Sequence, residues 1–146
     1  MRHRLFSTAL RTPVITATKR SISYTPSLDA MQFLQSRDFL LSHLGNYPTA
    51  YKEFRWPTLT HFNWALDYFD PMAKDNHRTG LVVVNEKGVS KHSFDDLYYR
   101  SNQVANFFEA HGIASGARVL IMLPNVPELW ESYLALIKTR AVIVPA

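Results

Sequence analysis

The side chains that could do chemistry are few in this sequence, and they are not grouped for it. The chain has no cysteine, which excludes disulfides, thiolate metal sites and a cysteine nucleophile. No two of its six histidines have the spacing of metal ligands, so we expect surface or ordinary hydrogen-bonding roles for all of them. They are His3, His43, His61, His77, His92 and His111.

Two short motifs suggest a site but are better explained as structure. The run GIASG from Gly112 to Gly116 resembles a serine elbow or a phosphate loop. However, no glycine lies two residues before Ser115, and no Lys-Ser/Thr pair follows Gly116. A turn between a helix and a strand is therefore favoured. Asp95 and Asp96 could form an acidic pair, but they lie where a helix should begin, and carboxylates there complement the helix dipole.

The first 27 residues differ in composition from the rest. Five basic residues and no acidic one precede Asp29, whereas eleven basic residues face twelve acidic ones from there onward. The net charge of +4 therefore belongs to this segment, and no basic stripe predicts nucleic-acid binding. Residues 1–27 are also rich in Ser and Thr, which predicts a presequence and a location in the mitochondrial matrix. The alternative is a disordered basic tail. No apolar run is long enough to span a membrane.

Residues 28–56 predict a peripheral segment, partly helical and partly irregular. Asp29 to Leu44 has the pattern of an amphipathic helix that ends at Gly45, and Asn46 to Pro48 predicts a turn. Pro57 to Phe69 predicts a second helix. Thr58 or Thr60 would cap it, and Asp70-Pro71 would end it, because the residue before proline avoids the α region.

The next stretch predicts a β-hairpin followed by a helix. Strands at 81–85 and 89–92 would be joined by the turn 85–88, which ends in glycine. Ser93 can cap the helix that follows through the amide of Asp96, and His111-Gly112 would end it.

The last 29 residues predict a βαβ unit and hence an α/β fold. Arg118 to Leu123 is almost continuously apolar, as in a parallel strand that is buried on both faces. Residues 124–140 are long enough for a crossover helix, so 141–144 should form a parallel second strand with an open edge. The turn 124–127 has no glycine to bring backbone amides close to a phosphate, so this unit is expected to be scaffold.

Ordered blocks over Leu59–Ala146 carry a family resemblance. They read FNWALDY (62–68), VVNEKG (83–88), SFDDL (93–97), SNQVA (101–105), VLIMLPNVPELW (119–130) and LALIKTRAVIVP (134–145). These blocks resemble the start of acyl-CoA synthetases of the adenylate-forming superfamily, and most closely the mitochondrial medium-chain branch. In one departure, Arg140 replaces the glycine that the family usually has before the last strand.

The resemblance implies an α/β fold in which residues 57–146 are the incomplete N-terminal portion of the large AMP-binding (adenylate-forming) domain. It implies a fatty acid–CoA ligase that converts a short- or medium-chain carboxylic acid, ATP and CoA into acyl-CoA, AMP and pyrophosphate, with Mg²⁺. The family's phosphate loop, nucleotide-binding block and catalytic lysine have no counterpart in this chain, so we expect no catalytic, cofactor-binding or metal-binding residue here. The alternative is a truncated, non-catalytic paralogue that acts as an interaction module.

Overall fold

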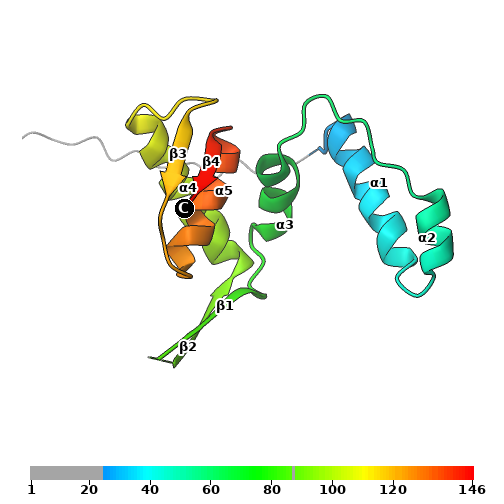
Figure 1. Cartoon of the computed structure of the whole chain (residues 1–146), viewed down its shortest axis with the longest axis horizontal. Coiled ribbons are helices and arrows are strands. Elements are labelled where there is room, and N and C mark those ends of the chain that lie inside the picture. The colour runs from blue at the N-terminus through cyan, green and yellow to red at the C-terminus, as the bar shows by residue number, and fades with distance from the viewer. Residues whose placement is uncertain (1–24, 87) are drawn as a thin grey trace, which may run out of the picture.

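The computed structural model describes residues 25–86 and 88–146 (Figure 1). The predicted presequence, 1–27, therefore lies almost entirely outside the described residues. The elements follow one another as α1 (Leu28–Ser42), α2 (Tyr47–Glu53), the π-helix η1 (Trp64–Phe69), α3 (Asp70–Ala73), β1 (Thr79–Asn85), β2 (Gly88–Ser93), α4 (Phe94–Ala110), β3 (Arg118–Ile121), α5 (Pro127–Lys138) and β4 (Val142–Pro145). This mixture of helices and strands confirms the α/β class.

The predicted peripheral segment is a pair of helices that stands apart from the strands (Figure 1). The first predicted helix is confirmed as α1, where Ser27 Oγ accepts a hydrogen bond from the amide of Ala30 at 3.1 Å. The predicted turn at Asn46–Pro48 is wrong, because these residues begin α2. Asn46 Oδ1 accepts from the amide of Thr49 at 3.3 Å, and Pro48 lies in the first turn, where its missing N–H costs nothing.

Helix α1 is fixed to the rest of the chain by the buried carboxylate of Asp29. Its Oδ2 accepts hydrogen bonds from the Thr60 amide at 2.9 Å, from Thr60 Oγ1 at 3.2 Å and from the amide of His61. The hydrogen bond from the His61 amide is the main cause that lowers the pKa of Asp29. Phe33 also stacks on Phe62, with 4.9 Å between the ring centroids. The hydrogen bonds of Asp29 and the stacking of Phe33 on Phe62 thus hold α1 against residues 60–62.

The predicted helix from Pro57 to Phe69 is wrong at both ends. Residues 57–63 are not helical, and the helix begins at Trp64. Its cap is Asn63, whose Oδ1 accepts from the amides of Ala65 and Leu66 at 3.0 and 3.2 Å. The alternative cap that was predicted, Thr60, is held by Asp29 instead.

The chain also stays helical through Asp70-Pro71, as far as Ala73. The preceding turn is π-helical, and the amide of Asp70 donates to the carbonyl of Ala65, five residues back. Proline's ring normally clashes with the carbonyl four residues back, and its missing N–H breaks the α-helical ladder. In a turn with i→i−5 hydrogen bonds, the α-helical bond to the carbonyl four residues back is not needed. Pro71 therefore fits in the first turn of α3.

The hairpin and α4 are confirmed. β1 and β2 are antiparallel, Asn85 pairs with Gly88, and Gly88 has a φ of 123°. Ser93 Oγ accepts from the amide of Asp96 at 3.0 Å while the Asp96 carboxylate accepts from the Ser93 amide at 2.8 Å, which completes a capping box. Gly112 ends the helix with a φ of 80°.

The βαβ unit is confirmed, but its predicted burial is not. β3 and β4 are parallel, with Arg118 opposite Val142 and Ile121 opposite Pro145. α5 covers one face, where Ile121 packs with buried residues of the helix. The other face is open, and Leu120 is 60% exposed, so the prediction of a strand buried on both faces is wrong. Among the described residues, no element covers this second face.

The described part of the chain contains no helix of the length and apolarity required to cross a membrane.

Asp29 generates a prediction about acid sensitivity. Because its folded-state pKa lies below the ordinary value of 3.8, its contribution to stability is complete above that value and is lost as the pH falls through the folded-state pKa. We expect the urea midpoint of the wild type to fall more steeply between about pH 5 and about pH 2 than that of Asp29→Asn. Asp38→Asn, at an exposed carboxylate of the same helix, should follow the wild type. Equal slopes for all three proteins would contradict the role of Asp29.

Candidate functional site

Lys138, at the end of α5, is a buried charged side chain with polar partners on two other helices. Its side chain is 4% exposed, and its Nζ forms an ion pair with Asp70 Oδ1 at 2.8 Å. The same ammonium group donates to Ser101 Oγ and to Asn102 Oδ1, each at 2.8 Å. It therefore joins α3, α4 and α5 at one point. We call these four residues the Lys138 cluster.

Burial and pairing act in opposite directions on this ion pair. Burial raises the pKa of Asp70 and lowers the pKa of Lys138, and in each case the partner's charge opposes the shift. Each charge is thus tolerated only because the other is present. Of the three donors of the lysine ammonium, two form hydrogen bonds, and Asp70 Oδ1 faces the ammonium as an ion pair without hydrogen-bond geometry. The cluster links α3, α4 and α5.

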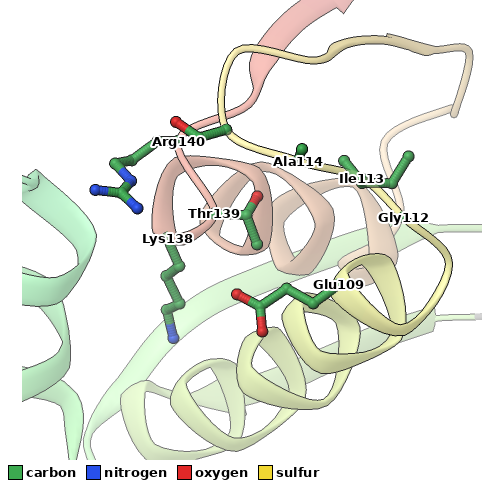
Figure 2. Close-up of a pocket in the computed structure, with 8 residues that line it drawn as sticks. Glu109, Gly112, Ile113, Ala114, Lys138, Thr139 and Arg140 are labelled. Carbon is green, nitrogen blue, oxygen red and sulfur yellow. The ribbon is translucent and has the colours of Figure 1, made fainter.

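A cavity of about 310 Å³ lies beside this cluster, between the end of α4, the loop after it and the turn from α5 to β4. Figure 2 shows Glu109 and Lys138 on the side of the helices, Ile113 and Ala114 on the loop, and the guanidinium of Arg140 pointing away from that loop. The lining contains one carboxylate, at Glu109, and the hydroxyls of Ser115 and Thr139. Thr139 Oγ1 donates to the carbonyl of Leu136 at 3.2 Å, so that hydroxyl serves the helix end.

The loop GIASG is a turn, as predicted. Gly112 and Gly116 have φ angles of 80° and 82°, which favour glycine, and the Gly116 amide donates to the carbonyl of Arg140 at 2.9 Å. No base is hydrogen-bonded to Ser115 in the described residues, and a nucleophilic serine needs one. This loop serves to connect α4 to β3.

Arg140 is held in the left-handed region, with a φ of 58°. It occupies the position after the C-cap of α5. The Ala141 amide donates to the carbonyl of Leu136 at 2.9 Å and the Arg140 amide to that of Ile137 at 3.1 Å. This is a Schellman ending, which prefers glycine at the position of Arg140. The arginine therefore reproduces the geometry that glycine would give and bears the strain itself.

The other residues considered from the sequence also have structural partners. Asp96 belongs to the capping box, and Asp95 Oδ1 accepts from the amide of Asp75 at 2.8 Å. His43 and His111 each bond through Nδ1 to a carbonyl four residues back, at 2.8 and 2.7 Å. No group of three or more His, Cys, Asp or Glu side chains that could hold a metal occurs in residues 25–86 and 88–146.

The Lys138 cluster was missed by the sequence reasoning. Two signals could have indicated it. One is Lys138, which ends the apolar run LALIK. The other is Asp70, because the proline that follows it was expected to end a helix there. A charge next to so many buried positions requires a partner. The sequence does not say which aspartate supplies it.

Comparison with known proteins assigns the family. The sequence profile of the family described as AMP-binding enzyme matches residues 72–146. That match covers half of the chain, and the chain therefore belongs to this family.

The relatives are considerably longer than this chain. It is 33% identical over 97 residues to acyl-coenzyme A synthetase ACSM5, mitochondrial, of Rattus norvegicus, a match that covers 61% of this chain and 17% of the relative. It is 30% identical over 112 residues to acyl-coenzyme A synthetase ACSM3, mitochondrial, of Homo sapiens. That match covers 70% of this chain and 19% of the relative. Among solved structures, the N-terminal subdomain of Klebsiella oxytoca NpsA matches 53% of this chain and 20% of that chain, with 26% identity and a TM-score of 0.46.

The buried ion pair predicts a non-additive pair of substitutions. Lys138→Met leaves Asp70 buried without its counter-charge, so we expect a loss of about 3 kcal/mol in the free energy of unfolding. The double variant Asp70→Leu/Lys138→Met should recover most of that loss, because apolar side chains remove both desolvation costs. The measurement is a double-mutant cycle by urea unfolding. Lys91→Met, at an exposed lysine of β2, should stay within about 0.5 kcal/mol of the wild type. A double variant as unstable as the sum of its single substitutions would contradict the cluster.

The strain at Arg140 predicts a stabilising substitution. Arg140→Gly should raise the free energy of unfolding by about 1 kcal/mol relative to Arg140→Ala, because only glycine adopts this conformation without steric cost. Both variants remove the same charge, so the comparison isolates the backbone effect in thermal or urea unfolding. If the alanine variant is as stable as the glycine variant, Arg140 is not strained in solution.

Proposed function

We propose that this chain is the N-terminal part of a mitochondrial ATP-dependent acid–thiol ligase. In the reaction, a carboxylate attacks the α-phosphorus of ATP and displaces pyrophosphate, and the thiol of CoA then displaces AMP to give the thioester. The observation that carries the proposal is the match of residues 72–146 to the AMP-binding enzyme family. The names of the rat and human relatives, both mitochondrial acyl-coenzyme A synthetases, support the type of ligase.

Within that enzyme we assign residues 57–146 to the beginning of the AMP-binding domain, 28–56 to a peripheral segment and 1–27 to a presequence. We further propose that no catalytic, cofactor-binding or metal-binding residue lies in this chain, and that the sites for ATP, CoA and Mg²⁺ are formed elsewhere in the enzyme. The ion pair and hydrogen bonds of Lys138 and the structural roles of Asp95 and Asp96 support this division. The chain spans 17–19% of the length of the two relatives, which supports it too.

The substrate that we propose is a short- or medium-chain carboxylic acid. The resemblance of the ordered blocks over Leu59–Ala146 to the medium-chain branch supports this assignment.

A fusion enzyme tests the function. Residues 25–146 would replace the matched segment of the rat relative, and the product would be assayed for acyl-CoA with ATP, CoA and acids of increasing chain length. We expect turnover with short or medium acids, whereas the chain of 146 residues alone should release no pyrophosphate, because we propose that the phosphate site is formed elsewhere in the enzyme. A folded fusion without ligase activity would contradict the proposed function. Pyrophosphate release by the chain alone would overturn its assignment as scaffold.

The presequence is tested separately. Residues 1–27 fused to a fluorescent reporter should direct it to the mitochondrial matrix, because a basic, acid-free amphipathic segment is drawn to a negative interior. A matched fusion in which Arg2, Arg4 and Arg11 are changed to Glu should stay in the cytosol. A cytosolic reporter with the unchanged segment would refute the assignment.

A further inference from the structure

The beginning of helix α1 limits how much of the N-terminal segment can be removed without loss of structure. Ser27 is the N-cap, and its Oγ accepts a hydrogen bond from the amide of Ala30 at 3.1 Å. Asp29 Oδ2, in the first turn, accepts hydrogen bonds from the amides of Thr60 and His61. A cut on the C-terminal side of Ser27 or of Asp29 would therefore remove a group that holds α1 in place.

A cut directly after Ser27 would also create an unfavourable charge. The new N-terminus would be the ammonium of Leu28, which is the first residue of α1. A cation at that position is repelled by the positive end of the helix dipole. The end of a removable segment must therefore lie before Ser27, although the change in composition continues to Asp29.

The sequence has one arginine close to this limit. The five basic residues that precede Asp29 end with Arg20, and the next Lys or Arg is Arg37, which lies inside α1. Arg20 is followed two residues later by the apolar Ile22 and then by a serine. This order resembles the pattern at which matrix processing peptidases cut the presequences of imported proteins.

We propose that the chain is a substrate of an arginine-directed endopeptidase of the mitochondrial matrix, which hydrolyses the peptide bond between Ser21 and Ile22. Water adds to the carbonyl carbon of Ser21 and the C–N bond breaks, so the products are a carboxylate at Ser21 and an ammonium at Ile22. This inference rests on the proposed function, because it requires import. It moves the end of the removed segment from residue 27 to residue 21.

This bond satisfies both the charge pattern and the helix. The cut removes all five early basic residues and leaves eleven basic residues against twelve acidic ones. Residues 22–27 remain ahead of α1, so Ser27 keeps its capping role, and the new ammonium is separated from a dipole that acts only within the first turn. A cut after Arg37 would instead divide α1, whose hydrogen-bonded backbone resists proteolysis.

Import of the full chain tests the proposal. The chain would be incubated with isolated mitochondria, and the N-terminus of the protease-protected product would be read by mass spectrometry. We expect a product that begins at Ile22. Arg20→Gln should lose this product, whereas Arg11→Gln, which removes the same charge farther from the bond, should still be cut between residues 21 and 22. An imported product that keeps Met1, or that begins at any residue other than Ile22, overturns the proposal.

A soluble matrix extract added to the purified full chain separates this inference from the targeting that it rests on. Cleavage between residues 21 and 22 in the extract, for a chain that mitochondria do not import, would refute the proposed location and leave the cleavage site standing. Equal cleavage of the wild type and of Arg20→Gln in the extract would overturn the proposal, because the bond would then be chosen without the arginine.

Urea unfolding tests the limit that α1 sets. A chain that begins at Ile22 should have the same midpoint as the full chain, whereas a chain that begins at Leu28 should have a lower one. Ser27→Ala in the full chain should also lower the midpoint, and Thr25→Ala, at an exposed residue before the helix, should leave it unchanged. Equal midpoints for the chains that begin at residues 22 and 28 would overturn the proposal.

Discussion

The buried ion pair between Lys138 and Asp70 is the constraint on which the arrangement of the helices depends. A charge with so little exposure is stable only if its partners are fixed, and two other helices, α3 and α4, supply the groups around Lys138. The position of Asp70 depends in turn on η1, since the π-helical turn carries the chain through Asp70-Pro71 without ending the helix. The π-helical turn η1 is therefore needed to place Asp70 where it can pair with Lys138.

The same interaction supports our proposal that Lys138 holds structure and takes no part in the reaction. Lysine is the residue that a phosphoryl-transfer enzyme would use against developing negative charge. Here its ammonium is paired with Asp70, donates to Ser101 and Asn102, and is withdrawn from solvent. The cavity next to it is lined by one carboxylate, at Glu109, together with Lys138 and Arg140. We propose that the described residues provide framework, and the unit formed by β3, α5 and β4 adds a parallel pair of strands with one exposed face.

How much the sequence predicted depends on whether the signal was local. Ser93 and Asp96 are three residues apart, and their capping box follows from that spacing alone; the hairpin and the ends of α4 were also predicted correctly. Asn46-Tyr-Pro and Asp70-Pro were misread because proline was taken to end or exclude a helix, whereas in both cases it lies in a first turn. Partners distant in sequence, such as Asp29 with Thr60 or Asp70 with Lys138, could not be predicted from composition or periodicity. The need for glycine at position 140 was recognised from the resemblance, and the structure shows how arginine meets it.

The most direct test of the central claim is the activity of the fusion enzyme that carries Asp70→Leu/Lys138→Met. If the Lys138 cluster is framework, kcat and KM should stay within about two-fold of the unsubstituted fusion once the fold is retained. A fall in kcat of ~100-fold, in a protein with an unchanged unfolding midpoint, would show that these residues take part in the reaction and would contradict the account.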